Sequence, residues 1–215
     1  MTDEELRAFW LAIENIDAPL EEATRLAFKL LLLMGRRSNE VLGARCSEFE
    51  LDRSDPVWRI PGERYKTRED IHLPLSAEAA AIIAELLRRA NGAAVLLPSP
   101  RDPTQPYGDG VLKCALSRLF KRGFLTCPRF SCHDLRRTAA HRISEDRGFP
   151  DELVAAFLGH AWGGVTSRHY SQARKIARTR PVAEDWANYL MSILAGAVPP
   201  QNIVALDNRR FTSKR

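Results

Sequence analysis

The chain has 215 residues, which is enough for one large domain or two small ones with a substantial core. Its 45% hydrophobic and 27% charged residues describe a soluble globular protein, and no apolar run reaches the roughly 20 residues of a membrane span. The acidic N-terminus excludes a signal peptide, and four irregularly spaced cysteines indicate reduced thiols, so we expect a cytoplasmic protein without disulfides.

The net charge of +5 is distributed unevenly along the chain. Residues 1–22 carry seven acidic residues against one basic residue, whereas residues 112–147 carry nine basic residues against three acidic ones. Residues 168–180 add five basic residues and no acidic one. A concentrated basic surface is typical of nucleic-acid-binding proteins. Basic runs also occur on solvated faces that bind nothing, so the charge alone decides little.

The first two predicted helices are bounded by capping signals. Thr2 and Glu5 match a capping box for a helix that ends near residue 13. A second helix is predicted from about residue 20 to Gly35, which is a suitable C-terminal cap. Its apolar residues cover nearly the whole circumference, so we expect this helix to lie buried in the middle of the domain.

Two arginines and a carboxylate follow this helix directly. Arg37 and Glu40 are three residues apart and can pair on a short helix that starts near Ser38. An exposed pair of this kind contributes very little to stability. The functional alternative is that the buried helix brings the charged pair to the floor of a site.

The next segments predict a small sheet. Residues 57–61 and 71–75 alternate apolar and polar side chains, and Lys66 lies between them near a hairpin turn. A lysine at a hairpin tip usually only improves solubility, but it can also be a mobile proton donor that reaches into a groove. Helices are then predicted from Ser76 to about residue 90 and from a cap at Asp109 to about residue 122.

The segment from Ser131 to Thr138 has the pattern of a helix entry. His133 and Arg136 are three residues apart and share a face, and Arg137 flanks it. Arginine can hold two phosphate oxygens in a fork, and histidine exchanges a proton near neutral pH, so this pattern favours a phosphodiester ligand. The alternative is that His133 caps the helix and that both arginines are solvated.

Two of the cysteines lie near His133, so a zinc site has to be considered. Cys127, Cys132 and His133 lack the paired short spacings of zinc ligands and have no evident fourth partner, so we expect no metal site.

Helices are predicted for residues 151–158 and 166–177, and Pro181 is expected to open a last amphipathic helix. The predicted fold is a mainly helical α+β domain, residues 1–198, with a small three-stranded antiparallel sheet at one edge. Residues 199–215 are expected to form a flexible basic tail.

Read in chain order, these polar residues resemble the catalytic domain of the tyrosine recombinases, also called phage integrases. Residues 34–40 resemble the first-arginine box, with Met34 in place of the usual Thr and Asn39 in place of Ser or Gly. Both chain ends resemble the integrases of prophages and genomic islands. The other boxes are matched by the hairpin lysine Lys66, by His133 and Arg136 in His-x-x-Arg, by His160 after Gly159, and by Tyr170 at the nucleophile position.

The resemblance implies a site-specific DNA recombinase that cleaves and rejoins strands through a 3′-phosphotyrosine intermediate, without cofactor or metal. It would integrate or excise a mobile element in a bacterial cell, and act as a tetramer on double-stranded attachment sites while remaining monomeric without DNA. The family's N-terminal core-binding and arm-binding domains are expected to be absent from this chain. The implied catalytic residues are Arg37, Lys66, His133, Arg136, His160 and Tyr170, supported by Glu40, with DNA contacts from Arg36, Arg137, Arg168 and His169.

Two other functions remain open at this point. A type IB topoisomerase uses similar chemistry to relax supercoils, although the prophage-like ends favour a recombinase. A catalytic-domain fragment can also bind DNA without turnover, because a missing N-terminal domain would complete the clamp around the duplex.

Overall fold

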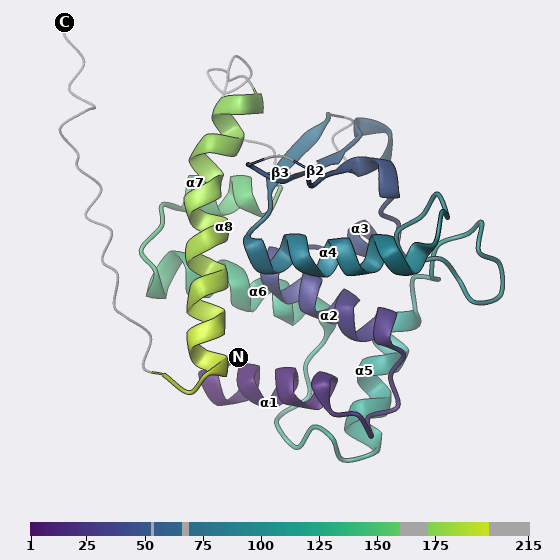
Figure 1. The fold of residues 1–215 in the computed structure, drawn as a ribbon. Helices are drawn as coiled ribbons and strands as arrows, with labels where there is room; N and C mark the ends of the chain where they lie inside the picture. The colour runs from purple at the N-terminus through teal and green to yellow at the C-terminus, as the bar shows by residue number, and fades with distance from the viewer. Residues whose placement is uncertain (53, 66–68, 160–171, 198–215) are drawn as a thin grey trace, which may run out of the picture.

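The computed structural model describes residues 1–52, 54–65, 69–159 and 172–197. Helices surround one central helix, α2, and a small sheet lies at one edge of the molecule (Figure 1). The described helices are α1 (Asp3–Glu14), α2 (Glu22–Met34), α3 (Ser38–Leu42), α4 (Ala77–Ala90), α5 (Val111–Lys121), α6 (Cys132–His141), α7 (Asp151–Phe157) and α8 (Gln172–Leu194). Short turns are η1 (Cys46–Glu48), η2 (Gly62–Arg64) and the π-helical η3 (Arg142–Asp146). The strands are β1 (Phe49–Glu50), β2 (Val57–Ile60) and β3 (Ile71–Pro74).

Helix α2 forms the centre of the core, as the sequence predicted. Its residues from Leu30 to Met34 are all nearly inaccessible to solvent. Helices α1, α4, α6 and α8 pack around it. The helix ends at Gly35, which has a φ of +56°. A Cβ at this position would lie 2.6 Å from Cδ2 of Leu158, so both the backbone conformation and the packing require glycine.

The sheet confirms the predicted antiparallel arrangement, with the strand order β1-β2-β3. Trp58 of β2 lies opposite Leu73 of β3 and is buried. Its Nε1 donates a 2.8 Å hydrogen bond to the carboxylate of Glu48, which also accepts bonds of 2.6 and 2.8 Å from Arg64. Because Glu48 is itself buried, this pairing fixes turn η2 at the base of the β2–β3 hairpin.

Most predicted helix caps are confirmed, and one is wrong. Thr2 forms its capping box, and Ser76 accepts from the backbone of α4. The predicted helix entry at Ser131 is also present, and Ser131, rather than His133, caps α6 through a capping box with Asp134. Asp109 does not cap α5, because the helix begins one residue later, with Gly110 as N-cap and no side-chain bond. Asp109 instead lies within the turn closed by the bond from Val111 N–H to the Gly108 carbonyl.

Helix α8 corrects the expectation that Pro181 opens a separate last helix. The helix runs continuously from Gln172 to Leu194 with Pro181 inside it. Tertiary contacts hold both halves. Arg180 donates to the Leu75 carbonyl at 3.3 Å, and Trp186 donates to the Leu32 carbonyl of α2 at 2.9 Å. These contacts compensate for the backbone hydrogen bond that proline cannot make. Residues 166–171 of the predicted preceding helix lie outside the described residues.

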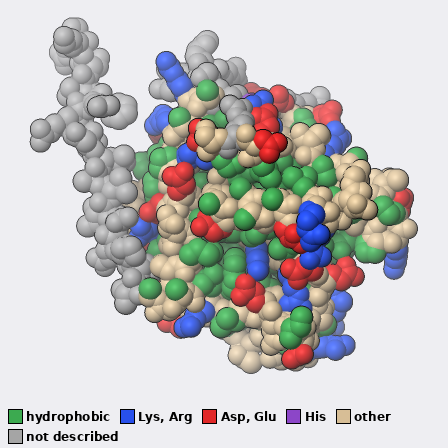
Figure 2. All heavy atoms as spheres, viewed as in Figure 1, with side chains coloured by type: hydrophobic (Ala, Val, Ile, Leu, Met, Phe, Trp, Pro, Cys, Tyr) green, Lys and Arg blue, Asp and Glu red, His purple; other side chains and the backbone are tan. Residues whose placement is uncertain are grey.

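The side of the molecule shown in Figure 2 is not uniformly basic. On the side shown in Figure 2, acidic and basic side chains are interspersed around an apolar area. No helix in the described ranges has an apolar stretch long enough to cross a membrane. The four cysteines are all free thiols. The predicted tail, residues 199–215, lies outside the described part of the chain, and the domain boundary at residue 198 stays a prediction.

Candidate functional site

The candidate site starts at the C-terminal end of α2, where Arg37 and Glu40 form the predicted pair. Arg37 is the N-cap of α3, and its backbone N–H donates to Glu40 Oε2 at 3.2 Å. Its Nη1 lies 2.9 Å from Glu40 Oε1. The Arg37 side chain remains 43% exposed, whereas that of Glu40 is only 12% exposed. The nearly buried carboxylate of Glu40 therefore holds the accessible guanidinium of Arg37 in place.

Arg36 occupies a very different position, and the structure corrects its predicted role as a DNA contact. The residue is 1% exposed, and its Nη2 lies 2.7 Å from Glu40 Oε2. Its guanidinium lies about 6 Å from the ring centroids of Trp58 and Tyr65. Nε and Nη1 of Arg36 have no hydrogen-bond partner among the described residues. A cation enclosed in this way does not reach a duplex at the surface.

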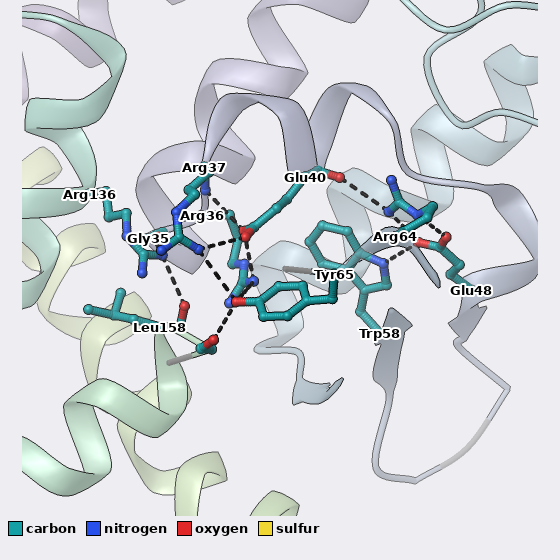
Figure 3. A network of polar contacts seen from close by, with 11 residues as sticks. Gly35, Arg36, Arg37, Glu40, Glu48, Trp58, Arg64, Tyr65, Arg136 and Leu158 are labelled. Carbon is teal, nitrogen blue, oxygen red and sulfur yellow. Dashed lines mark hydrogen bonds and ion pairs between the residues drawn. The ribbon is translucent and has the colours of Figure 1, made fainter. Parts of the chain in front are cut away.

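Arg136 joins two helix ends at the same place. It projects from α6, is 4% exposed, and its Nη1 donates to the carbonyls of Gly35 at 2.7 Å and Leu158 at 3.0 Å. Gly35 and Leu158 are the C-caps of α2 and α7. The C-terminal end of a helix carries partial negative charge, so a buried cation is favourable there. Figure 3 shows that Arg136, Arg37 and Arg36 lie in one cluster.

The charges in this cluster affect one another. Burial lowers the pKa of Arg136 to about 10, and the positive charges of Arg36 and Arg37 act in the same direction. Burial would raise the pKa of Glu40, but Arg36 and Arg37 outweigh it and hold that pKa below its usual value. Arg36 and Arg37 thus share the carboxylate of Glu40, and Arg136 adds a third positive charge nearby. Such an excess of positive charge, partly open to solvent, is suited to bind an anion with several oxygens.

His133 lies at the first turn of α6 and is exposed. It lines a pocket of about 380 Å³ together with Ser38, Lys113, Arg129 and Cys132. Because Ser38 directly follows Arg37, this pocket adjoins the arginine cluster. Arg137, in contrast, has a side chain that is 73% exposed and pairs with Asp134 at 3.4 Å. The structure therefore brings His133 to the edge of the cluster and leaves Arg137 at the surface.

Tyr65 belongs to the site although the sequence did not predict it. Its ring is buried, and its hydroxyl donates to the Gly159 carbonyl. The same hydroxyl accepts from Arg36 Nη2 at 3.4 Å and from Arg37 Nη1 at 3.5 Å (Figure 3). Its position directly before Lys66 was the only signal in the sequence, because its partners lie 28 to 94 residues away.

Five of the predicted site residues lie outside the described residues: Lys66, His160, Arg168, His169 and Tyr170. Two of their sequence neighbours are described, however. Tyr65 precedes Lys66 and Gly159 precedes His160, and these two neighbours are hydrogen-bonded to each other at the arginine cluster. Within the described ranges, no group of three or more His, Cys, Asp or Glu side chains is arranged to hold a metal ion.

Comparison with known proteins identifies relatives along most of the chain. The model of the phage integrase family matches residues 1–176. The chain is 29% identical over 181 residues to prophage integrase IntA of Escherichia coli K12, covering 84% of this chain and 42% of that protein. It is 28% identical to the integrase of Enterobacteria phage P4, covering 78% of this chain and 40% of that protein. The chain thus spans about two fifths of the length of these relatives.

Two solved structures have the same fold. The XerH site-specific recombinase bound to difH substrate matches with a TM-score of 0.61 and 23% identity, over 82% of this chain and 51% of that one. The catalytic core of lambda integrase matches with a TM-score of 0.52 and 21% identity, over 75% of this chain and 95% of that one. The second match covers nearly all of a single catalytic core, in agreement with the mainly helical architecture described above.

Proposed function

Because the chain belongs to the phage integrase family, we propose that it is the catalytic part of a site-specific tyrosine recombinase. It would cleave and rejoin DNA strands through a 3′-phosphotyrosine intermediate and so integrate or excise a mobile element. The observation that carries this proposal is the convergence of Arg37 and Arg136, which are 99 residues apart in the sequence, at one electropositive cluster beside His133.

The proposed reaction is a transesterification at one phosphodiester. The phenol oxygen of Tyr170 attacks phosphorus, the new P–O bond forms, and the bond from phosphorus to the 5′ oxygen breaks. The tyrosine proton leaves with the help of His133, and Lys66 protonates the departing 5′ oxygen. The products are a 3′-phosphotyrosine and a free 5′ hydroxyl. Rejoining reverses the step, so the phosphotyrosine bond conserves the energy of the cleaved ester.

The arginines would act on the non-bridging oxygens. Negative charge develops on these oxygens in the transition state, and Arg37 and Arg136 would neutralise it. His160 would donate a further hydrogen bond to the phosphate. Glu40 would act through Arg37, since its carboxylate already orients that guanidinium at 2.9 Å. Preorganised donors of this kind need no reorientation during the reaction.

We further propose double-stranded DNA as the partner. XerH has been solved bound to its difH substrate, and a lambda integrase tetramer has been solved bound to a Holliday junction. In this chain Lys113 and Arg129 lie beside His133 and would contact the DNA backbone near the reacting phosphate, with Arg137 as a further exposed contact. Arg168 and His169 are proposed as additional contacts. By analogy, four protomers would assemble on two DNA sites, from free protein that is monomeric.

The decisive experiment uses a nicked duplex that carries the attachment site of the mobile element. The nick allows the short fragment that carries the free 5′ hydroxyl to diffuse away. The covalent adduct then accumulates and appears as a shifted band on a denaturing gel. We expect the wild-type chain to form this adduct, and Tyr170→Phe to bind the same duplex without forming it. Absence of any adduct from the wild type, with the site correct, would contradict the proposal.

Two alternatives predict different results in the same assay. A fragment that only binds DNA retains the duplex but forms no adduct, and adding the part of a relative that this chain does not cover would restore adduct formation. A type IB topoisomerase relaxes a supercoiled plasmid that contains no attachment site, whereas the recombinase requires its site. The family membership and the prophage relatives favour the recombinase.

A further inference from the structure

The hydroxyl of Tyr65 joins three segments that are distant in the sequence. It lies at the end of turn η2, donates to the carbonyl of Gly159 after α7, and accepts from Arg36 and Arg37 before α3. A phenol has one donor hydrogen and two acceptor lone pairs, so these contacts use its full capacity. We propose that Tyr65 is a positioning residue that fixes the guanidinium of Arg37 for phosphate binding. This inference rests on the proposed function.

The guanidinium of Arg37 has few hydrogen-bond partners among the described residues. It is contacted by Glu40 Oε1 at 2.9 Å and by the Tyr65 hydroxyl at 3.5 Å, both through Nη1. Among the described residues, that guanidinium makes no other hydrogen bond. A guanidinium has five N–H donors in a rigid fork, so fixing one nitrogen leaves the remaining donors oriented toward a ligand. Among the described residues, loss of the hydroxyl would leave Glu40 as the single anchor of the Arg37 guanidinium.

The Tyr65 hydroxyl is itself held firmly in place. Arg64, the neighbour of Tyr65, pairs with buried Glu48, which also accepts from Trp58. Tyr65 is 6% exposed, and its aromatic ring lies 5.9 Å from the guanidinium carbon of Arg36. Ring and backbone are therefore anchored independently of the hydroxyl. This means that Tyr65→Phe removes the hydroxyl and keeps the packing, which makes it a clean test.

The backbone of Gly159 completes the connection between the two arginines. Its φ of +74° and the absence of a side chain allow close approach, since a Cβ there would lie 2.7 Å from the Tyr65 hydroxyl oxygen. Leu158, the preceding residue, accepts from Arg136 at 3.0 Å. The carbonyls of two consecutive residues therefore bind Arg136 and Tyr65, and Tyr65 in turn contacts Arg37. The hydroxyl thus sets the geometry between the two arginines proposed to bind one phosphate.

The test compares Tyr65→Phe with the wild type on two nicked substrates. The first carries the natural phosphodiester at the cleavage site. In the second, a methyl group replaces one non-bridging oxygen of that phosphate, so the reacting group is neutral and depends less on a guanidinium for charge neutralisation. We expect Tyr65→Phe to lower the single-turnover cleavage rate about tenfold on the phosphodiester and no more than about threefold on the neutral substrate. DNA affinity should change less than about twofold, as most of it arises from other phosphate contacts.

The ratio of the two rates separates positioning from loss of structure. Partial unfolding removes the same fraction of active protein from both reactions, so it leaves the ratio unchanged. An unchanged ratio in Tyr65→Phe would overturn the proposal, whether or not the variant is less stable. If the wild type forms no adduct on either substrate, the proposed function fails instead, and the two failures are therefore distinguishable.

Tyr107→Phe is the matched control. Tyr107 is also buried, at 7% exposure, and its hydroxyl donates a 2.6 Å bond to Glu21. Glu21 is the N-cap of α2, about 20 Å from the C-terminal end of that helix by the rise of 1.5 Å per residue. This variant loses one buried hydroxyl far from the arginine cluster. It should leave both cleavage rates and their ratio unchanged, and an equal loss in both variants would contradict a specific role for Tyr65.

Discussion

The guanidinium of Arg136 donates a 2.7 Å hydrogen bond to the carbonyl of Gly35, a residue 101 positions earlier in the chain. Gly35 terminates the buried helix α2, and Arg37 follows it by two residues. This single bond therefore connects the two arginine-bearing segments. The two arginines differ in exposure, because Arg136 is buried whereas Arg37 is partly exposed. Arg136 therefore has the larger structural role.

The two arginines should respond differently to truncation. Arg37→Ala removes a donor from an exposed site, so we expect adduct formation to fall at least about 100-fold with little change in stability. Arg136→Ala should abolish adduct formation and also lower the free energy of unfolding, by about 1–3 kcal/mol for each of the Gly35 and Leu158 carbonyls left unpaired. Single-turnover cleavage and urea denaturation measure the two effects. Equal stability losses would contradict this assignment.

Glycine at position 159 should be required for more than its backbone conformation. Gly159 and Gly148 have similar φ values of +74° and +69°, so alanine at either position costs about 1–2 kcal/mol of backbone strain. Only at Gly159 would the new Cβ meet neighbours, with Arg36 Nη1 at 2.5 Å. Because Arg36 is enclosed, Gly159→Ala should destabilise by about 1–3 kcal/mol more than Gly148→Ala. Similar midpoints for both variants in denaturation would show that the contact yields easily.

Acid should weaken the fold partly through Glu40. The pKa of Glu40 is lowered in the folded protein, because Arg36 and Arg37 outweigh the effect of burial. As the pH falls, Glu40 therefore takes up its proton at a higher pH in the unfolded chain than in the folded protein. The stabilisation that Glu40 contributes is present above pH 4.5 and is lost as the pH falls through the pKa of Glu40 in the folded protein. We expect the stability difference between wild type and Glu40→Gln to be largest above pH 4.5 and to narrow below it. Urea denaturation at a series of pH values measures this.

Glu85→Gln provides the control for the acid experiment. The hydrogen bond from Arg88 lowers the pKa of Glu85 to about 2, but this pair is exposed on α4. At about 1 M salt the Debye length is about 3 Å. The stability difference between wild type and Glu85→Gln should then no longer depend on pH, whereas the difference for Glu40→Gln should still do so, because Glu40 is enclosed. A pH dependence at Glu40 that disappears in the same way would mean that its carboxylate is screened by solvent.

Pro181 should limit the stability of α8. Proline in a helix interior is about 3 kcal/mol less favourable than alanine, and Pro181 is exposed, so alanine meets no packing restriction. Pro181→Ala should therefore raise the free energy of unfolding, by up to that amount, and increase the helical signal in circular dichroism. Glu184→Ala, an exposed change on the same helix, should alter stability by only a few tenths of a kcal/mol. No gain in Pro181→Ala would argue against a continuous helix.

The sequence predicted those features that depend on near neighbours in the chain. It predicted the capping box at Thr2, the end of α2 at Gly35 and the pair of Arg37 with Glu40, which all rely on spacings of four residues or fewer. The expectation for Pro181 failed because contacts of Arg180 and Trp186 with distant carbonyls outweigh a local preference. The cap at Asp109 failed by one residue, since a turn precedes the helix.

The burial of Arg36 and the role of Tyr65 could not be predicted locally. Arg36 and Arg37 are adjacent and identical in type, yet one is 1% exposed and the other has a 43% exposed side chain. The difference arises because Trp58, Tyr65 and Gly159, from three other segments, enclose Arg36. Only the tertiary arrangement distinguishes the enclosed cation from the accessible one.

The use of backbone carbonyls to hold Arg136 has a consequence for protein engineering. Its two acceptors, Gly35 and Leu158, belong to the ends of α2 and α7, so the aim of the guanidinium depends on where these helices stop. Inserting one residue into α2 would rotate its terminus by about 100° and shift it by about 1.5 Å. Anyone grafting this arginine pair onto another scaffold would have to transplant the two helix termini together with the side chains.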